Sequence, residues 1–173
     1  MECTGLHIML RLSTMDDLPL MAKWAADEEV MRHVVNRTFT YEEEKIWLET
    51  ALADPNLVQF TIVLHKTAQP IGSCGIHMKN PKPRHAHREG VEVGLLIGEK
   101  EEWGKGYGTE AVQLMTEYAR DILHVPCVWL LVNAVHERAQ KAYVKTGFVV
   151  TEKSINPDRT GQGSEQLVME RRF

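Results

Sequence analysis

Long apolar runs are missing from this sequence of 173 residues. The longest wholly apolar segment, residues 127–132, is far too short to cross a bilayer. The first twenty residues contain no basic stretch that leads into an apolar one, as a secretory signal does. We therefore expect a cytoplasmic protein that has no membrane partner.

Cysteines are few, and their spacing fits neither a disulfide framework nor a zinc site. Cys3, Cys74 and Cys127 are odd in number, far apart and outside any CxxC pair, so we expect reduced thiols. Cys74 and Cys127 fall in apolar segments, where an inert buried thiol is commoner than a nucleophile. His85 and His87 lack a third ligand nearby in the sequence, and a solvated loop explains them better than a metal. No metal site is expected.

A large net charge is also absent. The formal charge is −4 at pH 7, and we expect no nucleic-acid partner. The charge is unevenly placed, because residues 16–54 contain ten acidic and four basic side chains. This polarity fits an anionic cofactor held by the C-terminal part and a cationic acceptor met by the N-terminal part. Acidic side chains that simply solvate two helices would give the same pattern.

The composition is that of an ordinary globular domain, with 43% hydrophobic and 25% charged residues. A chain of this length can bury a continuous core without disulfides or a structural metal. We find no internal repeat, low-complexity tract or interdomain linker. The sequence therefore predicts a single domain that covers residues 1–173.

Two helices are expected before the main sheet. Thr14 with Asp17, and Thr40 with Glu43, have the form of capping boxes that open helices. The inward face of the first helix is predicted to carry Leu18, Met21, Trp24 and Ala25. That of the second is predicted to carry Ile46, Trp47 and Ala51.

The rest of the chain alternates between strand and helix patterns. Strands are predicted at residues 6–12, 57–65, 71–78, 90–98, 127–133, 148–152 and 166–172. A helix follows residue 106, with apolar positions at Ala111, Leu114, Met115, Tyr118, Ile122 and Leu123. Another spans residues 137–145 and ends at Gly147. The fold class is mixed α/β (α+β), with a mostly antiparallel sheet of about seven strands, one parallel crossover pair and about four helices.

A glycine-rich turn, WGKGYGT at residues 103–109, separates a predicted strand from a predicted helix. Main-chain N–H groups and the positive end of the helix dipole converge there, which suits a phosphate group. A Walker loop requires Ser or Thr after the lysine, but Gly106 follows Lys105. A dinucleotide motif that begins at Gly104 requires glycine where Thr109 stands. A glycine-rich turn without any ligand is the alternative.

Three segments carry a resemblance to a known family. They are EVGLLIG (residues 92–98), WGKGYGTEA (103–111), and ERA followed by YVKTGF (137–139 and 143–148). Over nearly its whole length, the chain resembles GNAT superfamily N-acetyltransferases, within the branch similar to ribosomal-protein-alanine N-acetyltransferases. The resemblance implies the acyl-CoA N-acyltransferase fold, a splayed parallel strand pair and acetyl-CoA as co-substrate.

The resemblance also implies the residues that bind the co-substrate. Main-chain amides of the glycine loop would bind the diphosphate, and the middle strand would pair with the pantetheine arm. Trp103 replaces the family's usual Gln or Arg, and His136 replaces its usual Asn. The expected binding residues are Leu95, Leu96, Ile97, Trp103, Gly104, Lys105, Gly106, Tyr107, Gly108, Thr109 and His136.

Two side chains are candidates for the chemistry. A lysine-like amine has a pKa of about 10.4 and attacks a thioester only after losing its proton. Glu92, a carboxylate on a central predicted strand, is the candidate general base, although a cross-strand ion pair would also explain it. By the resemblance, Tyr143 is the candidate general acid for the departing thiolate. The alternative is a tyrosine packed on the sheet.

Three functions remain open from the sequence. The first is an N-acetyltransferase that acts on a primary amine, either a protein N-terminus or a small molecule. The second is a non-catalytic acyl-CoA-binding or regulatory domain, and the third is a nucleotide-binding module. Glu92 and Tyr143 together favour the acetyltransferase over the non-catalytic domain. The mismatches to the Walker and dinucleotide motifs disfavour the nucleotide-binding module. The partners expected are an amine acceptor and, as in the enzymes it resembles, a second copy in a homodimer.

Overall fold

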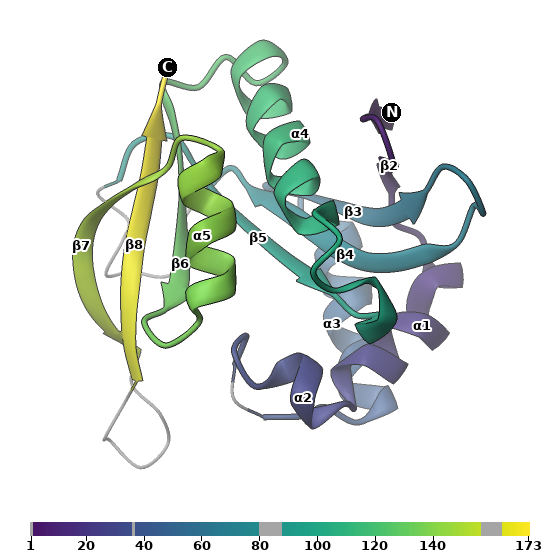
Figure 1. Cartoon of the computed structure of the whole chain (residues 1–173). Helices are drawn as coiled ribbons and strands as arrows, with labels where there is room; N and C mark the ends of the chain where they lie inside the picture. The colour runs from purple at the N-terminus through teal and green to yellow at the C-terminus, as the bar shows by residue number, and fades with distance from the viewer. Residues whose placement is uncertain (1, 36, 80–87, 157–163) are drawn as a thin grey trace.

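The computed structural model describes residues 2–35, 37–79, 88–156 and 164–173, and within them eight strands form one sheet (Figure 1). The strands are β1 (Glu2–Thr4), β2 (Ile8–Leu12), β3 (Leu57–Leu64), β4 (Pro70–His77), β5 (Val91–Ile97), β6 (Cys127–Asn133), β7 (Val149–Asn156) and β8 (Ser164–Arg172). The helices are α1 (Leu18–Ala25), α2 (Glu28–Met31), α3 (Tyr41–Ala53), α4 (Tyr107–Asp121) and α5 (Glu137–Lys145), with 3-10 turns η1 (Met15–Asp17) and η3 (Lys100–Glu102).

The sheet has the strand order β1-β2-β3-β4-β5-β6-β8-β7. Among the described strands, β5 and β6 pair in parallel and all other neighbours pair antiparallel. The predicted mixed, mostly antiparallel sheet with one parallel pair is confirmed. The predicted count of about seven strands is one fewer than the eight of the described sheet, because β1 was not predicted. This strand has only three residues and is recruited by pairing with β2.

The parallel strands β5 and β6 part soon after they begin. Their register joins Val91 to Val128 and Glu92 to Trp129, and pairing extends no further along the described strands. On their outer sides, β4 stays paired with β5 as far as Ile97, and β8 stays paired with β6. The two strands therefore diverge toward their C-terminal ends, and one edge of β5 is left open (Figure 1).

Helices cover both faces of the sheet and enclose two apolar clusters. Val91 and Val93 of β5 pack in the larger cluster with α4, whereas Leu96 contacts the smaller cluster built on α1. Because alternate residues of a strand point to opposite faces, Glu92 faces the α1 side together with Leu96. Trp24 of α1 is 1% exposed and lies so close to Gly98 that an added Cβ would be 2.1 Å from its ring.

Both predicted capping boxes are confirmed. Thr14 caps η1, which leads directly into α1, and Thr40 caps α3. In the second box, the Glu43 carboxylate accepts a hydrogen bond from the Thr40 N–H at 2.9 Å. The predicted inward face of α1 is likewise buried. None of the described helices has both the length and the apolarity needed to cross a membrane.

The inward face predicted for α3 is wrong in part. Ile46 and Trp47 are 56% and 43% exposed, whereas Leu48 is fully buried together with Ala51. The apolar residues of α3 are distributed around the helix, so the periodicity of its sequence does not indicate a single inward face. Packing against α1 and β3 determines which face is buried. Ile122, predicted to be inward, is 55% exposed because α4 has already ended at Asp121.

Candidate active site

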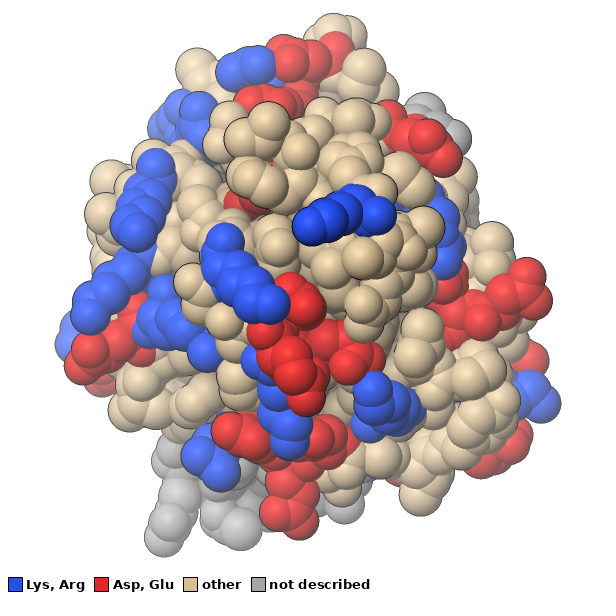
Figure 2. Space-filling model, turned by 45° about the vertical axis from the view of Figure 1, so that its right-hand side comes forward, with Lys and Arg blue, Asp and Glu red and all other residues tan. Residues whose placement is uncertain are grey.

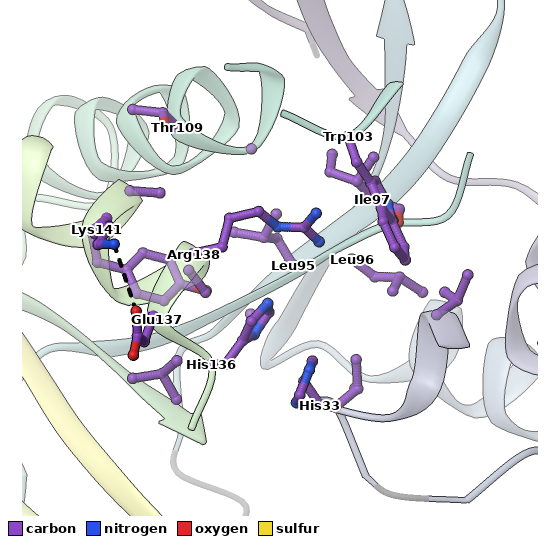
Figure 3. Close-up of a pocket in the computed structure, with 18 of the residues that line it drawn as sticks. His33, Leu95, Leu96, Ile97, Trp103, Thr109, His136, Glu137, Arg138 and Lys141 are labelled. Carbon is purple, nitrogen blue, oxygen red and sulfur yellow. Dashed lines mark hydrogen bonds and ion pairs between the residues drawn. The ribbon is translucent and has the colours of Figure 1, made fainter. Parts of the chain in front are cut away.

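A cleft of about 1020 Å³ opens where β5 and β6 part. Its walls come from β5, the end of β6, the turn before α4, the start of α5, and α2 with residues 32–35 that follow it. Segments far apart in the sequence thus meet around one space (Figure 3).

The glycine loop forms the end of this cleft beneath α4. Gly104 and Gly106 have φ angles of +78° and +93°, which L side chains rarely adopt, and a Cβ added at either would meet nothing within 4 Å. Gly106 is the N-cap residue of α4 and has no side chain that could cap the helix, and the first residues of α4, Tyr107 to Thr109, line the cleft. This cradle fits a diphosphate, because main chain and helix dipole both favour an anion there.

The open edge of β5 lines the middle of the cleft. A Cβ added at Gly94 would meet nothing within 4 Å, so the main chain is accessible at this point of the strand. Leu95, Leu96 and Ile97 follow it along the cleft. The Ile97 carbonyl already accepts a hydrogen bond from the Trp103 indole N–H at 2.7 Å. An extended chain that carries amides fits beside the strand at this edge.

Trp103 and Arg138 face each other across the mouth of the cleft. The Arg138 guanidinium carbon lies 4.5 Å from the centre of the Trp103 ring, and Figure 3 shows its side chain extending from α5 toward that ring. Lys105, in contrast, lies outside the lining. Its ammonium donates to the Glu102 carboxylate at 2.9 Å, and this hydrogen bond raises the pKa of Lys105.

Glu92 and Tyr143 approach the cleft from opposite faces of the sheet. Glu92 projects from β5 and is 8% exposed, beside the last residue pair that joins β5 to β6. Tyr143 projects from α5, is also 8% exposed, and has its ring centre 6.2 Å from that of Phe148. Burial raises the pKa of Tyr143 to about 12.

Two histidines meet across the cleft. His33, in the turn after α2, stacks on His136, the N-cap residue of α5, with ring centres 4.3 Å apart and planes 20° apart (Figure 3). The pKa of His136 is lowered to about 4, mainly by burial and in addition by the positive charges of a protonated His33 and of Arg138. Burial and the charges of Arg32 and Arg138 also lower the pKa of His33. Both shifts favour the neutral form of the imidazole.

Ion pairs hold the α1 and α2 side of the cleft to the turn after β5. The Glu99 carboxylate accepts hydrogen bonds from the Lys23 ammonium and the Trp24 indole N–H, each at 2.8 Å. The Lys100 ammonium lies 2.8 Å from the Asp27 carboxylate. Figure 2 shows acidic and basic side chains interspersed on the face it draws, without a broad field of one sign. Lys100 thus pairs with an acidic side chain of residues 16–54, whereas Lys23 of that segment pairs with a carboxylate outside it.

Comparison with known proteins identifies the family. A model of the acetyltransferase (GNAT) domain matches residues 7–149. The chain belongs to the GNAT acetyltransferase family. The predicted GNAT resemblance is therefore confirmed, while membership of the ribosomal-protein-alanine branch stays a prediction.

GNAT relatives share the fold over most of the chain. A GNAT acetyltransferase from Bacillus anthracis has a TM-score of 0.82 at 14% identity, covering 99% of this chain and 98% of that one. Spermidine N-acetyltransferase from Vibrio cholerae, solved with CoA and spermine, has a TM-score of 0.80 at 18% identity, covering 96% and 95%. At such identities these likenesses establish the fold alone.

Two curated relatives are longer than this chain. An uncharacterised N-acetyltransferase, p20, from Bacillus licheniformis is 27% identical over 116 residues, which are 65% of this chain and 62% of the relative. An uncharacterised protein from Methanocaldococcus jannaschii is 26% identical over 151 residues, which are 84% of this chain but 29% of the relative.

The GNAT fold brings together all of the predicted site residues except Lys105. Arg138 and His33 also line the cleft but were not predicted. Arg138 carries a weak signal, since it precedes Ala139 in the motif at the start of α5. His33 carries none, because only the fold brings it next to His136.

The other candidates of the sequence analysis do not join the cleft. Cys74 and Cys127 are buried outside its lining, and burial raises the pKa of both thiols. An inert role is consistent with this placement. His85 and His87 lie outside the described residues.

Proposed function

We propose that this protein is an acetyl-CoA-dependent N-acetyltransferase that moves the acetyl group to a primary amine by direct attack. One observation carries the proposal. The parted strands β5 and β6 open a single cleft that contains a glycine cradle at one end and both Glu92 and Tyr143 deeper in. A diphosphate site and two proton-transfer groups share one continuous space, as this reaction requires.

The chain's own groups would hold acetyl-CoA in an extended form. The amides at residues 104–109 face the diphosphate, and the open edge of β5 beside Gly94 pairs with the amides of the pantetheine arm. Arg138 adds a cation at the mouth between these two regions. The thioester that acetyl-CoA supplies would then lie near the apex where β5 and β6 part.

Glu92 is proposed as the general base. It lies at the apex and is largely shielded from solvent, facing the α1 side of the sheet. The acceptor would enter from that side, between the end of β6 and the turn after α2. The Glu92 carboxylate takes the ammonium proton, directly or through water, and the neutral amine then attacks the thioester carbonyl carbon.

Tyr143 is proposed to assist departure of the thiolate from the other face. A pKa of about 12 makes the phenol a much weaker acid than a thiol of pKa about 8.5, so full proton transfer to sulfur is uphill by roughly 5 kcal/mol. A hydrogen bond from the phenol to the developing negative charge has no such cost. We therefore assign Tyr143 the role of hydrogen-bond donor, while the proton that the amine nitrogen loses as the amide forms passes through water to the thiolate sulfur.

The alternative is a domain that binds acyl-CoA without turnover. Thermal shift with acetyl-CoA, CoA, ATP and NAD, followed by thiol release across a varied amine panel, separates the two. We expect stabilisation by acetyl-CoA and CoA only, with thiol release that depends on the amine. Stabilisation without thiol release from any amine would establish the binding domain instead.

Tyr143→Phe tests the assignment of the phenol. We expect kcat to fall by about 100-fold, because one donor to developing charge is lost, while the Kd for acetyl-CoA stays unchanged. Val144→Ala, at the exposed neighbouring position, is the matched control for helix packing. An unchanged kcat would remove Tyr143 from the mechanism.

A further inference from the structure

A buried glutamine lines the cleft without a hydrogen-bond partner for its side-chain oxygen. Gln166 of β8 is 9% exposed and belongs to the lining of the cleft. Its Oε1 atom is buried, and the described part of the chain provides no group that hydrogen-bonds to it. An unpaired buried carbonyl destabilises a folded protein, and most such groups in native structures have a partner. We therefore expect a partner here that the chain itself does not supply.

Polar groups at the adjoining end of β6 are already engaged with one another. The Gln140 side-chain amide donates to the carbonyls of Asn133 and Ala134 at 3.2 and 2.8 Å. The Asn133 side-chain oxygen accepts a hydrogen bond from the Val135 N–H at 3.1 Å. Asn133 is also the residue that pairs with Gln166 across the two strands. These contacts hold the strand end in place and use polar groups that adjoin the Gln166 carboxamide.

Strand register places Gln166 on the same face of the sheet as Glu92. Directly paired residues share a face, and alternate residues of a strand return to it. Glu92 pairs with Trp129, and Gln166 pairs with Asn133, which lies four residues farther along β6. Both side chains therefore lie on the α1 side of the sheet, from which the acceptor is proposed to enter. Leu131 lies midway between Trp129 and Asn133 on this face and lines the cleft.

The separation of the two side chains defines the length of a ligand that could contact both. Four residues along β6 and two strand spacings across the sheet put the Cα atoms of Glu92 and Gln166 about 16 Å apart. A hydrogen bond of about 3 Å at either end leaves about 10 Å for the ligand. Because Leu131 lies on this path, the middle of such a ligand would meet an apolar side chain.

We propose that Gln166 is a specificity-determining residue, which hydrogen-bonds an uncharged polar group of the acceptor, such as a carboxamide, about 10 Å from the reacting amine. This inference rests on the proposed function and narrows its substrate class. The terminal amide of a glutamine turns readily about its last bond, so it can present either its C=O or its N–H to the ligand. The acceptor places its amine beside Glu92, an apolar middle over Leu131 and its polar end against Gln166.

Matched amines of three lengths test the proposal in the wild-type protein. The amino amides 4-aminobutanamide, 6-aminohexanamide and 8-aminooctanamide are compared with butylamine, hexylamine and octylamine. At the shortest length the amide should give no advantage in kcat/KM, because it cannot reach Gln166. At the longest length we expect the amide to be used about fivefold to tenfold better than the alkylamine, because it gains one hydrogen bond.

A substitution at Gln166 tests the contact itself. Gln166→Met removes the carboxamide and keeps an unbranched side chain of similar length. The advantage of 8-aminooctanamide over octylamine should disappear, while kcat/KM for octylamine does not fall. The melting temperature should not fall either, because the substitution removes a buried polar atom that lacks a partner. Gln59→Met is the matched control, since Gln59 is 7% exposed on β3 and outside the lining, and the advantage should persist in this variant.

The outcomes distinguish this inference from the proposed function. Calorimetric titration of 8-aminooctanamide and octylamine into the CoA-bound protein adds a readout that is independent of turnover. An advantage of the amide that grows with length, in turnover and in binding, and that Gln166→Met abolishes supports the inference. An advantage that is absent at every length, or that Gln166→Met leaves unchanged, overturns it and leaves amine acetylation intact. No thiol release from any amine overturns the proposed function, and this inference with it.

Discussion

The cradle at Gly106 provides a quantitative test, since the chain contains a matched control for it. Gly106 and Gly147 have similar φ angles, +93° and +86°, and each stands at a helix end. An alanine in this left-handed region costs about 1–2 kcal/mol of unfolding free energy. At Gly147 the added Cβ would make an ordinary contact with the Arg171 side chain at 3.5 Å, so neither substitution creates a clash within the protein. Both variants should therefore lose similar stability.

Affinity for acetyl-CoA should separate the two variants. The Cβ of Gly106→Ala projects into the space that we assign to the diphosphate, whereas Gly147 lies outside the cleft. Displacing a phosphate from one main-chain N–H removes a charge-assisted hydrogen bond worth about 1.5–3 kcal/mol, which raises Kd by about 10- to 150-fold. Urea unfolding measures the loss of stability that both variants share. Isothermal titration calorimetry measures the loss of acetyl-CoA affinity that we expect for Gly106→Ala alone. Equal Kd values for the two variants would refute the assignment of the loop.

Two further predictions concern carboxylates. Glu92→Gln should lower kcat/KM by about 100- to 10,000-fold and flatten its dependence on pH, with little change in melting temperature; an unaltered pH–rate profile would point to another base. Burial raises the pKa of Asp17, but hydrogen bonds from Arg11, the Thr14 N–H and Thr61 outweigh this and hold the pKa below 3.8. The resulting stability is complete above about pH 5 and is lost as the pH falls through the lowered pKa, so Asp17→Asn should cost about 2–3 kcal/mol at pH 7 and less near pH 3. An equal cost at both pH values would contradict the ionic role of Asp17.

Local signals in the sequence were sufficient for most elements of the fold. The pairs Thr14 with Asp17 and Thr40 with Glu43 placed two helix starts correctly, because a capping box depends only on residues three positions apart. Gly147 has the left-handed conformation expected after α5, for the same reason. The inward face of α3 was not predictable in this way, since packing against α1 and β3 selects Leu48 over its apolar neighbours.

The sequence was sufficient to predict the parts of the cleft that lie on consecutive elements. It was not sufficient to predict contacts between residues far apart in the chain. The glycine loop and Glu92 lie on consecutive elements, so their positions followed from the strand and helix patterns. His33 stacks on His136, about a hundred positions away, and no periodicity in the sequence indicates this contact. The ion pair of Lys105 with Glu102 was also missed, although the two are only three residues apart, because the turn geometry decides that contact.

A crystal structure of the protein with bound CoA would show where the diphosphate and the thiol bind. We expect diphosphate density against the main-chain N–H groups of residues 104–109, with the pantetheine arm along the open edge of β5 and the sulfur near Glu92 and Tyr143. Density for the diphosphate elsewhere on the protein, or a sulfur remote from both side chains, would contradict this expectation.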